Sequence, residues 1–494
     1  MARRSPQVPM TEFELKLEIP AGKLAAVQAA VGAEPTTRLK LRALYIDTPD
    51  RVLARHGIAL RLRQENGRWV QTCKAPGRGP VERLEHNVSV DAGGDDAPPP
   101  DVGRHDGTPL GEKLRAALGQ ATDPRWAVVF ETDVDRVLRE VRQGASTLEL
   151  ALDEGRILAQ GREHVVRELE IELKDGLPQD AVRFARHWAA RHGLWLSTIS
   201  KAQRGRLLAE GRSDGAPVHA EHVDYARKAS SGEVVASVLA SCLAHVIGNA
   251  SELAAGSGDD EHVHQLRVGI RRMRTALREL QPLAPMDTGC EPALVNAFRA
   301  LGEHRDQVQV TRGFEARIQS AGGPALQALE ADTPVPDPAE VVRHPDFQDA
   351  LLELIGQQLE VQGADASPRK LARRGLQRLW RQVLRDGAHF AALEPVLQHR
   401  VRKRLKRLRY LAEFTQPLFG RHGHHAFLEV LKPAQDALGD NNDLLIALDA
   451  WRTRAAQDPQ ALFGVGWLTA QVEPQARACE KSLRRLGKAE RFWA

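Results

Sequence analysis

Carboxylates recur at β-strand spacing in two segments near opposite ends of the first 175 residues, and this spacing restricts the fold more than any other feature. They are Glu12, Glu14 and Glu18, and then Glu168, Glu170 and Glu172. Side chains of a strand alternate between its two faces, so each segment would aim its acids at one side of a sheet. Like charges at that density repel one another unless cations lie against them, and divalent ions with oxygen ligands are the usual partners. The spacing therefore predicts a metal-dependent site for a polyanion.

Basic residues of the same region follow the same spacing. Arg61 and Arg63 share a parity in the segment IALRLRQ, and further charged residues follow along the chain: Lys74, Arg83, Glu85, Arg136, Glu149, Asp153, Lys201 and Arg204. Taken one strand at a time, these charges also fit the solvated face of an open antiparallel sheet. A closed sheet can instead point all of them inward, so that carboxylates hold metal and basic groups hold phosphate.

The ordered pattern resembles the CYTH superfamily of triphosphate tunnel metalloenzymes, whose signature Glu-x-Glu-x-Lys corresponds to Glu12, Glu14 and Lys16. The resemblance spans most of residues 10–206. It continues through the segments LYIDTPDRVLARHGIALRLR, TCKAP, RLEHNV, FETDVDR, LELALDEG, ELEIELK and SKAQRG. It implies an eight-stranded antiparallel tunnel that hydrolyses or rearranges triphosphates with Mg²⁺ or Mn²⁺.

The same resemblance implies a role for each charged residue. The implied metal ligands are Glu12, Glu14, Asp153, Glu168, Glu170 and Glu172. The implied triphosphate-binding residues are Lys16, Arg61, Arg63, Lys74, Arg136, Lys201 and Arg204. Guanidinium and ammonium groups match phosphate oxygens and offset the charge that develops during phosphoryl transfer. The implied catalytic residues are Lys16, Tyr45 and Lys74, the last two by similarity to a pair proposed to assist proton transfer in thiamine triphosphatases.

A pattern of one histidine and three cationic residues occurs twice, at identical spacing, in the second half of the chain. The copies are His264, Arg267, Arg271 and Arg274, and His399, Arg402, Lys406 and Arg409. On a helix, residues at +3, +7 and +10 fall within roughly 80° of the histidine, so each copy forms a basic stripe. The apolar residues on the opposite side are Leu266, Ile270, Met273 and Leu277, and Val401, Leu405, Leu408 and Ala412. Ordinary amphipathic helices with solvated basic faces would explain one stripe, but they do not explain matching histidines in two.

Each stripe is followed by a second matching element, Leu301-Gly302 with Arg305 and Asp306, and Leu438-Gly439 with Asn442 and Asp443. We expect these acids to pair with the stripes or to cap a helix. Together the two motifs resemble the CHAD family, an all-helical domain associated with inorganic polyphosphate, over residues 219–494. The resemblance implies that both stripes bind polyphosphate. Nucleic acid is the disfavoured polyanion, because aromatic residues make up 5% of the chain and only Tyr410 interleaves with a stripe.

The length of 494 residues exceeds the size at which a single core keeps growing. We expect a multidomain α+β protein in which an N-terminal antiparallel β-barrel or tunnel, CYTH-like, precedes an all-α helical bundle, CHAD-like. The predicted tunnel domain covers residues 10–206 and the helical domain residues 219–494. A linker, rich in glycine and polar residues, covers residues 207–218.

Several features bear on the compartment. Four cysteines lie far apart without Cys-x-x-Cys spacing, which favours a reducing compartment and indicates neither zinc nor a disulfide framework. The basic N-terminus is not followed by an apolar segment, which argues against a signal peptide. The most apolar stretch, residues 234–255, contains polar side chains and Glu252, so we expect a buried helix and no membrane partner. The predicted location is the cytoplasm, where the helical domain could target the enzyme to polyphosphate granules.

The sequence therefore predicts a metal-dependent inorganic triphosphatase, which converts triphosphate to diphosphate and phosphate, joined to a module that binds inorganic polyphosphate. A class IV adenylyl cyclase and a thiamine triphosphatase are alternatives on the same tunnel fold, and both need a slot for an organic base. A non-catalytic polyphosphate-binding scaffold with a degenerate tunnel is the alternative from another class. The intact set of Glu12, Glu14 and Lys16 disfavours the scaffold, because degeneration should first remove metal-binding acids.

Overall fold

The structure is a computed structural model in which the chain forms two compact units. It describes residues 10–77, 82–90, 96–119, 124–325, 336–420 and 423–494. The first unit contains residues 1–219, 243–266 and 338–360, and the second contains residues 220–242, 267–337 and 361–494. Helices α6 (Ser231–Ala254) and α7 (Asp260–Glu279) contribute residues to both units.

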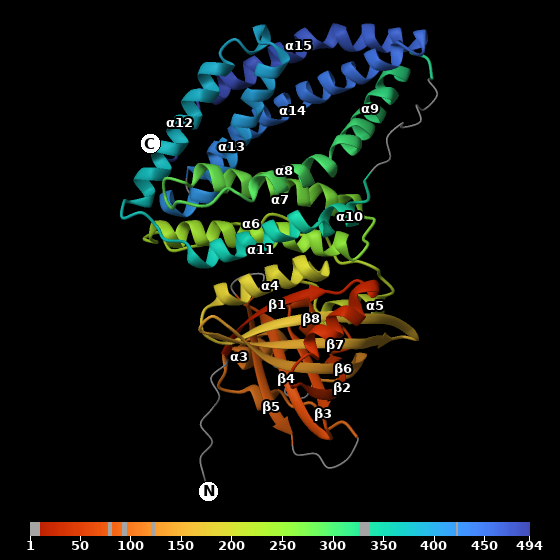
Figure 1. The fold of residues 1–494 in the computed structure, drawn as a ribbon. Helices are drawn as coiled ribbons and strands as arrows, with labels where there is room; N and C mark the ends of the chain where they lie inside the picture. The colour runs from red at the N-terminus through yellow and green to blue at the C-terminus, as the bar shows by residue number, and fades with distance from the viewer. Residues whose placement is uncertain (1–9, 78–81, 91–95, 120–123, 326–335, 421–422) are drawn as a thin grey trace. The chain divides into compact units, whose positions relative to one another are not determined.

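The first unit contains a closed antiparallel barrel (Figure 1). Its long strands are β1 (Met10–Glu18), β2 (Thr37–Asp47), β3 (Ala59–Glu65), β4 (Arg68–Pro76), β5 (Glu82–Val90), β6 (Ala127–Gln143), β7 (Ser146–Ala159) and β8 (Arg162–Asp175). They pair in the order β5-β4-β3-β2-β6-β7-β8-β1, and β1 pairs again with β5, which closes the sheet. A two-residue strand, β9 (Trp195–Leu196), adds to the end of β1. The predicted eight-stranded antiparallel tunnel is confirmed.

The barrel has polar residues inside and apolar residues outside. In the register of β1 with β8, Lys16 lies opposite Glu170 on the inner face, while Leu15 lies opposite Ile171 on the outer face. Leu15 and Ile171 are fully buried, because helix α4 (Pro178–His192) packs over β1 and β8. Hairpin turns keep this alternation in register; the β3–β4 turn uses Asn66 and Gly67, both at positive φ, as a twisted two-residue turn requires.

Further helices complete the first unit. They are α1 (Leu24–Val31), α2 (Val52–Arg55), α3 (Pro109–Leu118), α5 (Lys201–Glu210), α10 (Pro338–Arg343) and α11 (Pro345–Glu360), with short 3₁₀ turns at Ala21–Lys23 and Val102–His105. Helix α11 packs against α4, so that α4 lies between the sheet and a second helical layer. Cys73 faces away from the tunnel and is buried in an apolar cluster with residues of α2 and α3. This agrees with the sequence, because Cys73 is next to Lys74 on a strand and neighbouring residues point to opposite faces.

The second unit is helical. Its remaining helices are α8 (Glu291–Ala300), α9 (Glu303–Ser320), α12 (Pro368–Gly387), α13 (Pro395–Phe419), α14 (His424–Ala455) and α15 (Leu462–Leu486), with 3₁₀ turns at Phe390–Ala392 and Pro459–Ala461. One core cluster joins α9, α14 and α15 through Phe314, Trp451 and Leu468. The predicted apolar sides of the two stripe helices, α7 and α13, are buried at all eight positions.

Helix α6 is the one helix in the described part of the chain that is long and apolar enough to cross a membrane. Its most apolar window has a mean hydropathy of 1.6, but 67% of that window is buried within the protein. This burial is usual for a core helix and agrees with the buried helix predicted for residues 234–255.

Candidate functional site

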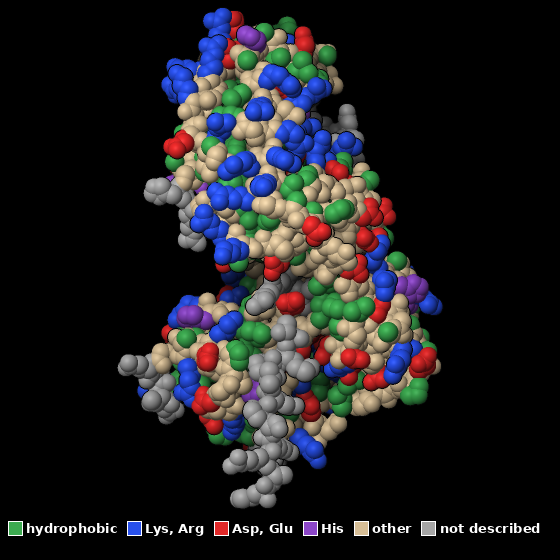
Figure 2. Space-filling view, turned by 90° about the vertical axis from the view of Figure 1, so that its left-hand side faces the viewer, with side chains coloured by type: hydrophobic (Ala, Val, Ile, Leu, Met, Phe, Trp, Pro, Cys, Tyr) green, Lys and Arg blue, Asp and Glu red, His purple; other side chains and the backbone are tan. Residues whose placement is uncertain are grey.

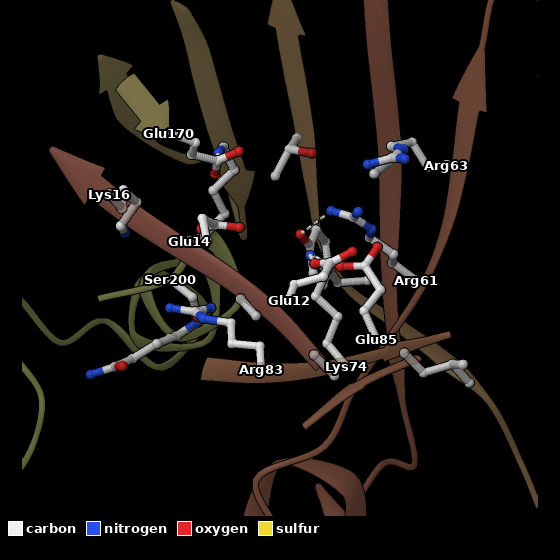
Figure 3. Close-up of a pocket in the computed structure, with 18 of the residues that line it drawn as sticks. Glu12, Glu14, Lys16, Arg61, Arg63, Lys74, Arg83, Glu85, Glu170 and Ser200 are labelled. Carbon is white, nitrogen blue, oxygen red and sulfur yellow. Dashed lines mark hydrogen bonds and ion pairs between the residues drawn. The ribbon is translucent and has the colours of Figure 1, made fainter. Parts of the chain in front are cut away.

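The barrel encloses a cavity of about 660 Å³, which holds nearly all of the predicted tunnel residues (Figure 3). Those that line it are Glu12, Glu14, Lys16, Tyr45, Arg61, Arg63, Lys74, Arg136, Asp153, Glu168, Glu170, Glu172 and Lys201. The alternation of charges along the strands thus places acids and bases around one internal space.

Three carboxylates gather at one side of this cavity. Oxygens of Asp153 on β7 and of Glu168 and Glu170 on β8 all lie within 4.8 Å of one another. Lys201 at the start of α5 contacts all three, with its Nζ 2.7 Å from Asp153 Oδ2 and 3.0 Å from Glu170 Oε1. Arg136 on β6 donates from Nε to Asp153 and from Nη2 to Glu170, each at 2.6 Å. The cluster is therefore held together by two partly buried cations.

The charges of this cluster are strongly coupled. Burial alone would raise the pKa of Glu170, but Lys201 and Arg136 hold it well below its usual value. Burial outweighs the neighbouring Lys16 and Lys201 at Glu168 and raises its pKa to about 7. Glu168 is thus the member of the cluster that holds a proton most readily near neutral pH.

A second acid–base cluster lies on β1, β4 and β5. Lys74 forms an ion pair with Glu85, and its Nζ lies 3.9 Å from Glu12 Oε2. Burial and the Glu85 carboxylate raise the pKa of Glu12 to about 8. Burial acts in the same direction on Glu85, but Lys74 and Arg61 hold the pKa of Glu85 at about 2. The Glu12–Glu85 pair therefore tends to share one proton near neutral pH.

Two arginines of β3 point into the cavity beside an aromatic pair. Arg61 donates from Nη1 to the Tyr45 hydroxyl at 3.2 Å, and Tyr45 stacks on Phe130 with ring centroids 4.3 Å apart. The Nε atoms of Arg61 and Arg63 are buried without a hydrogen-bond partner. Burial and the neighbouring Arg61 lower the pKa of Arg63 to about 10. Arg63 also forms an ion pair with Glu65, but the buried Nε donors without partners on this cavity wall suit an anionic ligand.

Arg204 is the predicted tunnel residue that the structure does not bring to the cavity. It lies on α5, where its Nη1 donates to the Ser213 carbonyl at 3.4 Å. Helical periodicity places Ala202 and Arg206, four residues apart, on the face that lines the cavity. Arg206 therefore occupies the place that was predicted for Arg204.

The strand spacing predicts that Arg83 and Glu85 point inward but gives neither a specific role, and both line the cavity. Their parity within RLEHNV was the available signal, because alternate residues of a strand share a face. The role of Glu85 follows from its position opposite Lys74 on the neighbouring strand. This register between two strands cannot be read from the sequence of one strand.

The donor set of the cavity fits a hard divalent cation. Carboxylate oxygens are the ligands that Mg²⁺ and Mn²⁺ prefer, and Asp153, Glu168 and Glu170 lie close enough to share one ion. Glu12, Glu14 and Glu172 line the same space and could supply further ligands. A bound cation would take over part of the charge compensation that Lys201 and Arg136 now provide.

The two basic stripes come together in the second unit. Burial, together with Arg271 and Arg402, lowers the pKa of Lys406 to about 6, which shows that cations of α7 and α13 lie close to one another. Lys403 on α13 is affected in the same direction by burial and by Arg274. Figure 2 shows many Lys and Arg side chains gathered over the helical part of the chain. We call the set Arg267, Arg271, Arg274, Arg402, Lys403, Lys406 and Arg409 the basic surface.

The elements that follow each stripe help to hold it. A Cβ at Gly302 would collide with the Arg267 guanidinium, so this position admits only glycine while Arg267 donates to the Phe298 carbonyl at 2.9 Å. In the second copy, Asn442 Oδ1 lies 2.9 Å from His399 Nδ1. Asp443 acts on Lys406 in the direction that favours its charge, as the predicted acid–stripe pairing requires. The side chains of Arg305 and Asp306 lie outside the described residues.

His264 and Arg274 occupy less enclosed positions. His264 is exposed one turn before Arg267 on α7, and Arg274 forms an ion pair with Glu291 at 2.8 Å. Arg409 is paired with Glu413 on its own helix at 2.7 Å. Two of the stripe cations are therefore partly neutralised by local acids.

A closed tunnel lined by acids and bases, followed by helices that carry two basic stripes, defines a tunnel-fold protein with an added helical domain. Residues 10–205 match the CYTH domain family and residues 237–452 match the CHAD domain family. The chain therefore contains a CYTH domain and a CHAD domain, and the predicted resemblance to both families is confirmed.

Individual proteins share parts of this organisation. The chain is 31% identical over 207 residues to the inorganic triphosphatase of Haemophilus influenzae, a match that covers 40% of this chain and only about half, 55%, of that protein. Among solved structures, the CHAD domain of Ricinus communis is 25% identical with a TM-score of 0.42, covering 55% of this chain and 96% of that one. A candidate adenylyl cyclase of Hippeastrum with a dominant triphosphatase activity is 18% identical with a TM-score of 0.30, covering 41% and 97%.

Substitution of Lys201 by Met should destabilise the metal-free protein and make its stability respond more strongly to Mg²⁺. Asp153, Glu168 and Glu170 would lose a shared counter-ion, and loss of one partner from a buried charge cluster costs about 3–5 kcal/mol of unfolding free energy. A divalent cation bound to the three carboxylates should restore part of this loss. The measurement is the thermal unfolding midpoint in excess chelator and in Mg²⁺.

The matched control is Lys174→Met, because Lys174 is half exposed and pairs with Glu149 and Glu172. Loss of such a pair should change the unfolding free energy by less than about 1 kcal/mol. Equal midpoints for Lys201→Met and wild type in chelator would show that Lys201 does not compensate the cluster.

Proposed function

We propose that the chain is a metal-dependent inorganic triphosphatase that hydrolyses triphosphate to diphosphate and phosphate. The observation that carries this proposal is the tunnel cavity, whose wall combines clustered carboxylates with unpartnered arginine Nε atoms. We assign catalysis to residues 10–206 and polyphosphate binding to residues 219–494, joined by a linker at 207–218. The similarity to a protein named inorganic triphosphatase supports the choice of substrate.

The acidic and basic residues of the cavity would have different roles. Arg61, Arg63 and Arg136 would bind the phosphate oxygens, since guanidinium groups offer paired donors in a plane. Lys16 and Lys201 would neutralise charge that develops on the transferred phosphoryl group. Mg²⁺ or Mn²⁺, when bound by the carboxylates, would polarise a phosphoryl oxygen and lower the pKa of a bound water.

Proton transfer is assigned to Tyr45 and Lys74. The Tyr45 hydroxyl accepts a hydrogen bond from Arg61, so its own proton remains available for donation. Lys74 forms an ion pair with Glu85, and its Nζ lies 3.9 Å from Glu12 Oε2. In its ammonium form Lys74 would donate a proton to the departing product.

We further propose that the basic surface binds inorganic polyphosphate. Its cations lie close enough to lower the pKa of Lys406 and Lys403, and such crowding is relieved by a polyanion. A polymer without bases needs no aromatic platform, and Arg271 has a buried Nε without a partner that a phosphate could satisfy. In the cytoplasm this surface would concentrate substrate or bring the enzyme to polyphosphate granules.

An organic triphosphate is the second candidate substrate. Tyr45 and Phe130 line the cavity and offer an apolar surface against which a base could pack. Adenylyl cyclase or thiamine triphosphatase chemistry would use this surface, whereas inorganic triphosphate would not.

The test is phosphate release from purified protein supplied with triphosphate, ATP, thiamine triphosphate or long-chain polyphosphate, each with Mg²⁺, Mn²⁺ or excess chelator. Fast metal-dependent release from triphosphate alone is the expected result. Preferred turnover of ATP or thiamine triphosphate would favour the second candidate. Absence of release from every substrate, with polyphosphate still bound, would leave a binding scaffold.

Two sets of variants should separate the two sites. Glu14→Gln should lower metal-dependent turnover by about two orders of magnitude, equivalent to about 3 kcal/mol, because an amide is a poorer metal ligand than a carboxylate. The double variant Arg267→Ala with Arg402→Ala should weaken polyphosphate binding and leave turnover of triphosphate within about twofold. Turnover is measured by phosphate release, and binding by calorimetry with long-chain polyphosphate.

Each variant of this pair is the control for the other. A folded Glu14→Gln protein that also loses polyphosphate binding, or a double variant that also loses turnover, would contradict the assignment of the two activities to separate sites.

The pH dependence of polyphosphate binding should reveal Lys406. Its pKa of about 6 means that the free protein carries a largely neutral amine at pH 8, while a bound polyanion favours the ammonium form. Binding is then accompanied by proton uptake, and affinity rises as the pH falls from about 8 towards 6. Calorimetry in two buffers of different ionisation enthalpy measures the uptake.

Lys406→Arg is the matched variant, because a guanidinium stays charged over this range. It should bind more tightly than wild type at pH 8 and take up fewer protons, while the contribution of the stripe histidines remains common to both proteins. Identical proton uptake by the two proteins would contradict the assignment.

A further inference from the structure

One side of the tunnel is completed by a segment outside its eight long strands. Residues 195–204, here the closing segment, run from β9 into the first turn of α5. Lys201 brings its ammonium group to the three clustered carboxylates, and the Ile199 carbonyl accepts a hydrogen bond from Lys16 Nζ. Figure 3 shows Ser200 among the residues that line the cavity. The position of two tunnel cations therefore depends on this segment.

The barrel holds the closing segment along the edge next to β1, where Leu196 pairs with Leu17 and Trp195 with Glu18. The Ser197 amide donates to the Lys16 carbonyl at 2.9 Å, and Arg83 Nη2 donates to the Thr198 carbonyl at 3.5 Å, close to the limit of a hydrogen bond. These contacts fix the edge next to β1. They leave the opposite edge of the segment to be held by something else.

Side chains of two helices hold that opposite edge. The Leu196 amide donates to Gln348 Oε1 on α11 at 2.7 Å, and the Thr198 amide donates to Ser251 Oγ on α6 at 3.1 Å. Gln348 and Ser251 are 2% and 1% exposed, so water does not compete for these bonds. The Gln348 amide is itself oriented, because its Nε2 donates to the Val342 carbonyl at 2.6 Å.

Two further contacts support the ends of the segment. Gln203 Nε2 donates to Glu252 Oε1 on α6 at 3.0 Å. The Arg343 guanidinium lies over the Trp195 ring at 4.5 Å and donates to the Ala254 carbonyl. Residues of α6, α10 and α11 thus contact the closing segment along its length. All of these contact residues lie within residues 237–452, the range that matches the CHAD family.

We propose that Gln348 and Ser251 are positioning residues for the reaction in the tunnel, and that the CHAD sequence is a structural part of the active site. They hold the closing segment so that Lys201 and the Ile199 carbonyl keep their places against the tunnel acids and Lys16. This inference rests on the proposed triphosphatase function. Misplacement of a reacting or stabilising group by about 1 Å costs on the order of 100-fold in rate, so loss of either hydrogen bond should be visible in turnover.

The experiment compares kcat and KM for triphosphate with Mg²⁺ in full-length wild type, Gln348→Leu, Ser251→Ala and Ser251→Thr. Gln348→Leu and Ser251→Ala remove the acceptors of the Leu196 and Thr198 amides. Each should lower kcat roughly tenfold and change KM by less than about threefold, because Lys201 acts on charge that develops in the transition state. Ser251→Thr retains the hydroxyl and should restore kcat to within about twofold of wild type.

Arg186→Gln is the matched control at the same helix contact. Arg186 on α4 forms ion pairs with Asp349 and Glu353 on α11, with Nε 2.7 Å from Asp349 Oδ1. Its substitution loosens the α4–α11 contact but leaves Gln348 and Ser251 in place. It should therefore keep kcat within about twofold of wild type.

The outcomes separate the inference from the function on which it rests. A wild-type protein that releases no phosphate overturns the proposed function, and the inference with it. An active wild type with unchanged kcat in Gln348→Leu and Ser251→Ala overturns the inference alone. Equal losses in Arg186→Gln, or failure of Ser251→Thr to restore kcat, would show a general packing effect instead. Should Gln348→Leu fail to fold, the Ser251 pair decides the question by itself.

Discussion

The fold depends on the compensation of carboxylates that a closed sheet has removed from water. Asp153 is fully buried and Glu168 nearly so, and an isolated charge in such a place would be neutralised or would unfold its surroundings. Lys201 and Arg136 supply the missing charge, and each contacts more than one carboxylate. A cluster of this kind stays charged only while every member is in place. The barrel must therefore close, and the chain after β9 must return to its rim.

Polar residues inside the barrel force apolar residues to its outside, and these need cover. Leu15 and Ile171 are buried beneath α4, and α11 packs against α4 in turn. The helical layers are thus a consequence of the same alternation that fills the tunnel with charge. In an ordinary half-exposed sheet the apolar face forms the core, whereas here the core of the barrel is the site and the hydrophobic layers lie around it.

The alternation of charges predicted the tunnel face of almost every strand, because the side-chain period of a strand is two and a register slip would reverse every residue. It did not predict the position of Arg204 correctly, because Arg204 lies on helix α5 and side chains of a helix repeat about every 3.6 residues. The role of Glu85 needed the β4–β5 register, and the contacts of Gln348 and Ser251 join residues 152 and 53 positions apart. Helical spacing predicted the two stripes, but the proximity of Lys406 to Arg271 depends on the packing of α7 and α13 in the tertiary structure. Local periodicity therefore predicts which face of a strand or helix a residue occupies. The residues that this face contacts depend on long-range packing.

The two proposed polyanion sites solve the same electrostatic problem in opposite ways. Eleven acidic and ten basic residues line the tunnel, so it would need a metal ion to attract a triphosphate. Its walls would accept only a chain that fits between them. The basic surface carries an excess of cations and needs no metal, and its partly exposed stripes set no limit on polymer length. Attraction to such a surface weakens with ionic strength, while contacts inside the enclosed cavity are screened much less. Capture of polyphosphate would therefore be the salt-sensitive step, and phosphoryl transfer would depend on the divalent cation.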